Sequence, residues 1–174
     1  MSKWVWGVVA IVVIIIIVVI IVIATSVQYY RIKSMWTGSE NDNSVNYLDV
    51  LDNQLIVSPT GAKFSLSPTA DGTAYYIKNS SKVITALNGT ANMAKLSVAT
   101  NTNASNHSWI IQPALVSSDV DIFTGGLLLV FIPSSDTTKS MNLLGTVQPT
   151  NSPVGLYDKG TNTKIEQQWT LVPA

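Results

Sequence analysis

The sequence of 174 residues has no cysteine, one histidine, one arginine and few charges, since only 11% of its residues are Asp, Glu, Lys or Arg. Without cysteine there can be no disulfide bond and no thiolate nucleophile or ligand. The single histidine, His107, leaves neither a histidine metal cluster nor a second imidazole for a proton relay. The sequence also has no Gly-x-Ser-x-Gly elbow. We therefore expect a protein that is not an enzyme and that holds no metal and no cofactor.

Positive charge is scarce as well. After Trp36 the chain has seven lysines and no arginine against ten acidic residues, a net charge of −3. Proteins that bind nucleic acid neutralise phosphates with a stripe of Lys and Arg, and no such stripe occurs here. The composition therefore excludes nucleic acid as an expected partner.

A long apolar run opens the chain. Residues 4–24 carry no charge, and sixteen of these 21 residues are Val or Ile. As a helix the run would cover roughly 30 Å, the hydrocarbon thickness of a bilayer. Insertion would gain on the order of 5–10 kcal/mol. Because the apolar core of a cleaved signal peptide is about 7–15 residues long, the length favours a single-pass transmembrane helix.

Aromatic and basic side chains flank this run, as they do at membrane interfaces. We predict that residues 1–36 form the membrane segment and that its interface anchors are Trp4, Trp6, Tyr29, Tyr30, Arg31, Lys33 and Trp36. The basic residues on the two sides are nearly balanced, with a slight excess after the run. This excess favours a cytosolic location for the rest of the chain.

The composition then changes to Ser, Thr, Asn and Gly. Residues 37–44 are polar and rich in turn formers, and we expect them to form a stalk. Residues 45–174 show no sustained helical periodicity but about eleven short β-branched or alternating runs between turn clusters. This spacing predicts an all-β domain, either a β-sandwich or a closed β architecture.

An internal repeat of the form aromatic-x-aliphatic-x-Pro favours the closed architecture. It occurs three times, at Phe64–Pro68, Trp109–Pro113 and Trp169–Pro173. In a strand, the aromatic residue and the aliphatic residue two positions later face one core, and the proline ends the ladder. Three such closing strands predict a pseudo-threefold β-trefoil, with a β-sandwich as the alternative. The first block is one strand short unless residues 35–37 supply it.

These blocks resemble ricin-B-type β-trefoil domains, whose repeats close with Gln-x-Trp. Gln167-Gln168-Trp169 matches this element fully, Trp109 matches it in part, and Phe64 only by its aromatic character. The resemblance covers residues 45–174. It implies a fold that binds sugars through an Asp early in a repeat, an aromatic platform, and an Asn or Gln near the closing Trp.

Only the third block retains part of that constellation. The early position falls near Thr85 in the second block and near Asn142 in the third, where Tyr157 offers an aromatic ring and Gln167 an amide. The resemblance thus implies one weak carbohydrate site at Asn142, Tyr157 and Gln167. The alternative is that Tyr157 and Gln167 only pack and bond the backbone.

Four Asn-x-Ser/Thr triplets could carry N-linked glycans if the domain enters a secretory lumen. They begin at Asn79, Asn88, Asn103 and Asn106. His107, which follows in the same polar loop, is expected to face solvent.

Two functions fit these features. The first is a structural protein whose β domain docks on a membrane-proximal protein assembly. The order of Tyr29-Tyr30 and Trp36-Thr37-Gly38 after a Val/Ile-rich helix resembles membrane-anchored minor capsid proteins of large double-stranded DNA viruses. This resemblance implies a component of a virion membrane, with the lipid bilayer and a capsid shell as partners. The second is a membrane-tethered, lectin-like module that binds glycans.

Overall fold

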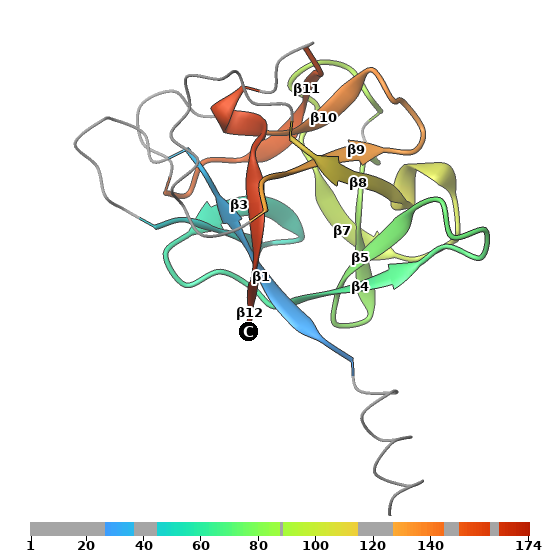
Figure 1. Cartoon of the computed structure of the whole chain (residues 1–174), viewed down its shortest axis with the longest axis horizontal. Helices are drawn as coiled ribbons and strands as arrows, with labels where there is room; N and C mark the ends of the chain where they lie inside the picture. The colour runs from blue at the N-terminus through green and yellow to red at the C-terminus, as the bar shows by residue number, and fades with distance from the viewer. Residues whose placement is uncertain (1–26, 37–44, 88, 115–126, 145–149, 161–163) are drawn as a thin grey trace, which may run out of the picture.

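The computed structural model describes residues 27–36, 45–87, 89–114, 127–144, 150–160 and 164–174 (Figure 1). The predicted transmembrane helix over residues 4–24 and the segment 37–44 therefore lie outside the described residues. Within those ranges, no helix is long and apolar enough to cross a bilayer.

The described residues form short strands and two 3-10 turns. The turns are η1 (Ser105–His107) and η2 (Ile165–Gln167). The strands are β1 (Tyr29–Ser34), β2 (Tyr47–Leu51), β3 (Gln54–Ser58), β4 (Phe64–Pro68), β5 (Tyr75–Asn79), β6 (Lys82–Thr85), β7 (Ser97–Thr100), β8 (Trp109–Pro113), β9 (Leu129–Pro133), β10 (Lys139–Leu143), β11 (Val154–Asp158) and β12 (Trp169–Pro173).

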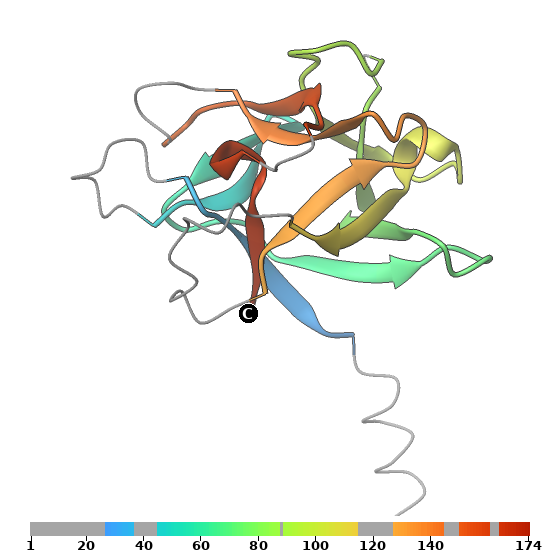
Figure 2. The same ribbon diagram turned by 45° about the horizontal axis from the view of Figure 1, so that its top comes forward.

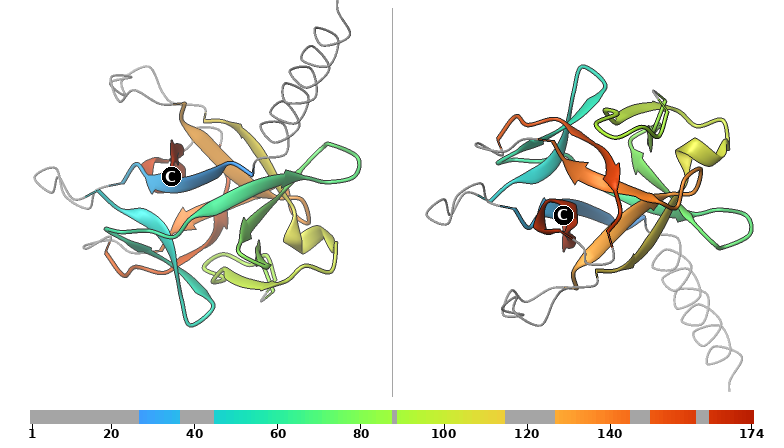
Figure 3. Two further views of the ribbon diagram at one scale, coloured as in Figure 1. Left: turned by 90° about the horizontal axis from the view of Figure 1, so that it is seen from below. Right: turned by 90° about the horizontal axis from the view of Figure 1, so that it is seen from above.

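Six of these strands close into a barrel. In the order β1-β4-β5-β8-β9-β12, each strand pairs antiparallel with the next, and β12 pairs with β1. The other six strands form three hairpins, β2–β3, β6–β7 and β10–β11. Each third of the chain thus supplies two barrel strands and one hairpin, and Figure 3 shows these units side by side around the barrel. The β-trefoil prediction is confirmed, and the sandwich alternative is wrong.

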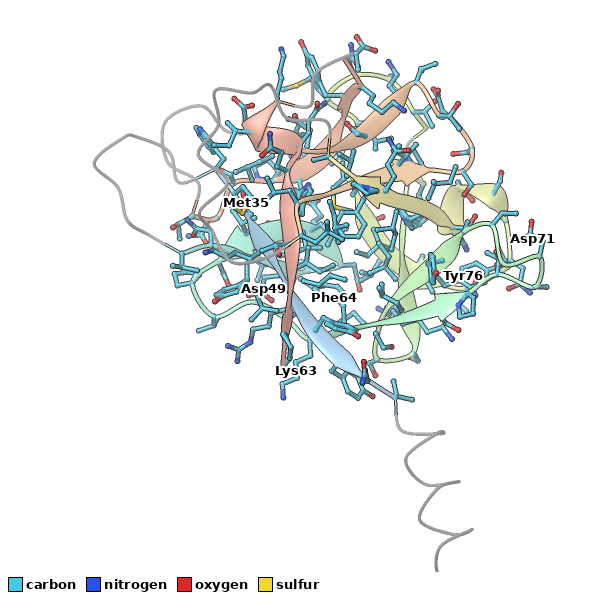
Figure 4. All side chains as sticks on the ribbon, in the orientation of Figure 1. Met35, Asp49, Lys63, Phe64, Asp71 and Tyr76 are labelled. Carbon is cyan, nitrogen blue, oxygen red and sulfur yellow. The ribbon has the colours of Figure 1, made fainter. Side chains whose placement is uncertain are left out.

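The three closing aromatics belong to one hydrophobic core. Phe64, Trp109 and Trp169 are 0–1% exposed, and Phe64 points into the interior of the domain (Figure 4). In each repeat, a backbone carbonyl of the second strand accepts a hydrogen bond near this core. Trp109 Nε1 donates to the carbonyl of Ile84 at 3.0 Å, and Trp169 Nε1 donates to the carbonyl of Met141 at 3.3 Å.

Phe64 has no side-chain N–H, so in the first repeat a backbone amide is the donor to the equivalent buried carbonyl. The carbonyl of Leu48, which is equivalent to that of Ile84 or Met141, accepts a hydrogen bond from the amide of Ala62 at 3.0 Å. A buried carbonyl without a donor would cost about 1–3 kcal/mol. The weak match of Phe64 to the Gln-x-Trp pattern therefore does not interrupt the threefold arrangement.

The predicted boundary of the β domain at residue 45 is wrong, because β1 is an integral barrel strand. It pairs with β12 over five residues, from Tyr30 opposite Pro173 to Ser34 opposite Trp169. Its side chains alternate in burial, with Ile32 and Ser34 in the core. β1, rather than residues 35–37, is the strand missing from the first block.

This strand also changes the interpretation of residues 37–44. They connect β1 to β2, and these two strands pair with each other. The segment therefore joins two strands of one domain and is not a stalk between a membrane and that domain. Aromatic and basic residues next to an apolar run suggested a membrane flank, but Tyr, Arg and Lys in alternation with Ile and Ser equally suit a half-exposed barrel strand.

Candidate functional site

The three hairpins offer three equivalent positions for a ligand, and they differ in chemistry. Asp49, Thr85 and Asn142 each follow a fully buried core residue on the first strand of a hairpin. On the second strand, the corresponding platform positions are Ser58, Ala99 and Tyr157, as the registers of the hairpins show. Of the three, only the third hairpin therefore has an aromatic ring at the platform position of its second strand.

In the first two hairpins the polar groups are bound within the protein. The Asp49 carboxylate accepts hydrogen bonds from Ser58 Oγ at 2.5 Å and from the Val50 amide at 2.8 Å. Thr85 Oγ1 donates to the carbonyl of Asn106 at 3.1 Å. These groups stabilise their own hairpins, and no ring lies opposite them to receive a ligand.

The third hairpin borders a cavity of about 290 Å³. The cavity is lined by Met93, Asn142, Leu143, Leu144, Tyr157, Lys164 and Glu166. It combines an apolar floor with one phenol ring, one amide, one ammonium and one carboxylate. A small number of polar groups converging on an apolar pocket is typical of sites for small organic ligands.

Two of the three predicted site residues meet in this cavity. Asn142 is 9% exposed, and its Nδ2 donates to the carbonyl of Leu143 at 2.6 Å. Tyr157 lies two positions along the paired strand, opposite Ser140, and is half-buried. Lys164 Nζ lies 5.7 Å from the centroid of the Tyr157 ring, within cation–π range.

The third predicted residue, Gln167, supports the site from behind. It is fully buried and does not line the cavity. Its Nε2 donates to the carbonyl of Asp158 at 3.0 Å, which fixes the end of β11 just after Tyr157. Among the residues that the structure describes, its buried Oε1 has no hydrogen-bond partner. The amide of the Gln-x-Trp element thus positions the aromatic strand.

A polar cluster holds the far end of the same hairpin. Lys139 Nζ donates to Asp158 Oδ1 at 2.5 Å and to Asn92 Oδ1 at 3.0 Å, and Asn92 Nδ2 donates to Asp158 Oδ2 at 2.6 Å. The hydrogen bond from Lys139, followed by that from Asn92, lowers the pKa of Asp158 below its usual value. These hydrogen bonds therefore favour the ionised carboxylate.

His107 does not face solvent as the sequence suggested. It is 3% exposed, and its Nδ1 accepts a hydrogen bond from the amide of Thr102 at 3.1 Å. Burial lowers the pKa of His107 below 6.5, so the ring is neutral at pH 7. His107 lies two residues before Trp109, just as Gln167 lies two residues before Trp169. It therefore replaces the glutamine of a Gln-x-Trp element.

The predicted glycosylation positions lie in different surroundings. Asn103 is exposed, whereas Asn79 and Asn106 are half-buried. Asn79 Nδ2 also donates to the carbonyl of Lys63 at 3.1 Å. Asn88 lies outside the described residues.

Of the predicted interface anchors, Trp4 and Trp6 lie outside the described residues, and the others belong to β1 or directly follow it. Tyr29 is 46% exposed, while Tyr30, Arg31, Lys33 and Trp36 are half-buried. Arg31 lies 5.8 Å from the centroid of the Tyr47 ring. These side chains are therefore part of the barrel strand β1 or of the residues just after it, whether or not a membrane lies beside them.

Comparison with known proteins places this geometry in a wider context. No protein-family model matches the chain, and no curated protein sequence matches it. Solved structures do. A designed threefold-symmetric protein, ThreeFoil, superposes with a TM-score of 0.62 at 17% identity, over 84% of this chain and 99% of that one.

Two lectins superpose on the chain to a similar extent. The Macrolepiota procera ricin B-like lectin, solved with lactose, has a TM-score of 0.60 at 17% identity, over 86% of this chain and 98% of the lectin. The chain also matches half of the Polyporus squamosus lectin, with a TM-score of 0.62 at 17% identity. The fold is a β-trefoil. At this level of identity the likeness concerns the fold, and the ligand must be argued from the site itself.

The structure adds residues that the sequence analysis missed. Lys164 and Glu166 line the cavity, and neither lies on a strand, because Lys164 directly precedes η2 and Glu166 belongs to it. Asp49 also went unnoticed. A comparison of the three blocks could have found it, because Leu48-Asp49-Val50 has the same pattern as the segment around Asn142.

Proposed function

We propose that this β-trefoil is a non-enzymatic carbohydrate-binding module and that the cavity beside β10 and β11 is its sugar site. The single observation that carries the proposal is the meeting of Tyr157, Asn142 and Glu166 on one cavity of about 290 Å³. Small-ligand pockets typically enclose about 300–1,000 Å³. The cavity is therefore of a size to hold about one sugar ring.

The chemistry of the lining suits a sugar. The Tyr157 ring offers a flat apolar surface for the C–H face of a pyranose. Carboxylate oxygens at Glu166 accept hydrogen bonds from hydroxyl groups, and the ammonium group of Lys164 donates them. Early in the third repeat the cavity has an amide, Asn142, and near the closing Trp169 it has a carboxylate, Glu166. The ricin-B resemblance implies the reverse order, so we expect a sugar preference that differs from that of such lectins.

We further propose that residues 4–24 anchor the module in a membrane. The support is the sequence: a run without charge, long enough to cross the hydrocarbon layer. The β domain would then act at a membrane surface.

A glycan array tests the carbohydrate proposal. The full-length protein in detergent or nanodiscs is compared with Tyr157→Ala and with Tyr76→Ala, a matched control whose tyrosine is half-buried on β5, away from the cavity. We expect reproducible binding of a defined glycan class that Tyr157→Ala reduces at least tenfold and Tyr76→Ala leaves intact. Equal binding by the wild type and Tyr157→Ala would contradict the proposal.

A second candidate function is docking on a membrane-proximal protein assembly, such as the shell beneath or around a virion membrane. The observation that favours it is a set of exposed apolar side chains, each 44–66% exposed. They are Leu51, Leu87, Met93, Leu127 and Ile165. Crosslinking from the surface lysines in intact particles tests this function. Crosslinks dominated by one abundant protein support docking, and crosslinks spread over many proteins contradict it.

A further inference from the structure

A second groove lies at the other end of the domain, where the chain enters β1. It has a volume of about 600 Å³, and β1, β4 and β5 supply its walls. Its principal side chains are Val27, Tyr29, Tyr30, Leu66, Tyr75 and Lys78, and none of the described residues that line it is acidic. The groove therefore combines apolar surface, phenol hydroxyl groups and one ammonium.

This composition suits the headgroup layer of a bilayer. Val27 is 61% exposed, Tyr29 46% and Tyr75 37%, which is unusual exposure for large apolar or aromatic side chains gathered in one place. Tyrosine prefers the membrane interface because its ring is apolar and its hydroxyl is polar. Lysine near such a surface is attracted by lipid phosphates and anionic headgroups.

The length of chain before β1 sets how far this groove can stand from a membrane. The apolar run ends at Ala24 and β1 begins at Tyr29, so four residues separate them. Fully extended, four residues span about 14 Å. The headgroup layer itself takes up about 5–8 Å on each side of the bilayer. The remaining length is much shorter than the width of a domain of this size, which is about 30–40 Å.

We infer that this groove lies in the headgroup layer of the bilayer and binds phospholipid headgroups through Tyr29, Tyr75 and Lys78. The inference rests on the proposed anchoring of residues 4–24. The inference also defines how the domain is oriented relative to the membrane. Figures 1 and 2 show β10 and β11 at the end of the domain opposite the start of β1. The sugar cavity would therefore face away from the membrane, toward ligands in the surrounding solution.

The absence of cysteine makes the test direct, because one introduced cysteine is the only thiol of the chain. Ser80→Cys places a fluorophore at the exposed rim of the groove. Thr137→Cys places the same fluorophore on an exposed turn between β9 and β10. The full-length proteins are incorporated into phosphatidylcholine–phosphatidylserine vesicles that carry a headgroup spin label. We expect quenching at Ser80→Cys to exceed that at Thr137→Cys severalfold.

A spacer distinguishes binding of headgroups by the groove from closeness to the membrane that the short connection alone imposes. A flexible insert of about 12 Gly and Ser residues after Ser26 frees the domain to leave the surface. If the groove binds headgroups, quenching at Ser80→Cys persists with the spacer and falls when Tyr75→Ser and Lys78→Gln are added. Tyr76→Ser is the matched control, because Tyr76 is the adjacent tyrosine and lines a different groove.

The outcomes distinguish this inference from the proposals on which it rests. Failure of the wild-type protein to float with vesicles would contradict the anchoring and this inference together. Flotation with equal quenching at the two positions, or loss of quenching at Ser80→Cys once the spacer is present, would leave the anchoring intact and overturn the docking. Glycan binding involves the opposite end of the domain, so Tyr75→Ser should leave it unchanged.

Discussion

Replacement of Trp169 by phenylalanine tests why two repeats close with tryptophan. In the third repeat the indole N–H is the donor to the buried carbonyl of Met141, at 3.3 Å. Trp169→Phe removes this donor and leaves the carbonyl in the core, at a cost of about 1–3 kcal/mol. The smaller ring also leaves a cavity worth about 1–2 kcal/mol. We therefore expect the free energy of unfolding to fall by about 2–5 kcal/mol, against a typical total of about 5–15 kcal/mol.

The measurement is urea denaturation of the full-length protein, followed by circular dichroism so that loss of a fluorophore does not matter. Trp36→Phe is the matched control, since Trp36 packs half-buried at the edge of the core and should lose less than about 1 kcal/mol. A loss for Trp169→Phe no greater than that of the control would refute the reasoning. The Met141 carbonyl would then have found another donor, as Leu48 has in the first repeat.

Two further predictions concern the other repeats. The pKa of His107 is lowered by burial, so the unfolded chain binds the proton more readily and stability falls as the pH drops below about 6.5. His107→Gln should remove part of the decrease in melting temperature between about pH 7 and pH 5, and an unchanged difference would contradict this. Gly61→Ala should destabilise the domain by about 1–3 kcal/mol more than Gly72→Ala. Both glycines have φ near +70°, but a Cβ at Gly61 overlaps the Tyr47 side chain while a Cβ at Gly72 meets open space. Equal losses of stability for the two variants in urea denaturation would contradict this packing.

The sequence predicted the threefold architecture because its closing strands repeat a pattern with a physical cause. An aromatic residue, an aliphatic residue two positions later and a proline mark a strand that buries one face and then stops. Phe64, Trp109 and Trp169 accordingly lie in one core. β1 was missed because its composition has two explanations. Tyr, Arg and Lys beside an apolar run fit a membrane flank, and only the pairing with β12, distant in sequence, identifies a barrel strand.

The candidate site was predictable only where it lies on strands. Asn142 and Tyr157 occupy the paired strands of one hairpin, where the ricin-B resemblance implied them. Glu166 lies in the 3-10 turn η2 and Lys164 directly before it, and their position next to Tyr157 depends on the whole fold. The burial of His107 had a signal in the sequence, since it stands two residues before Trp109 as Gln167 stands before Trp169. The polar residues around it masked this signal.

Calorimetric titration of the full-length protein with the glycan that it binds best tests the central claim most directly. The account predicts one bound glycan per chain, because only the third hairpin pairs a polar side chain with an aromatic platform. Tyr157→Ser should abolish the binding heat, while Ser58→Ala and Ala99→Ser, at the equivalent positions of the other hairpins, should leave it unchanged. Three glycans per chain, or full binding by Tyr157→Ser, would contradict the account.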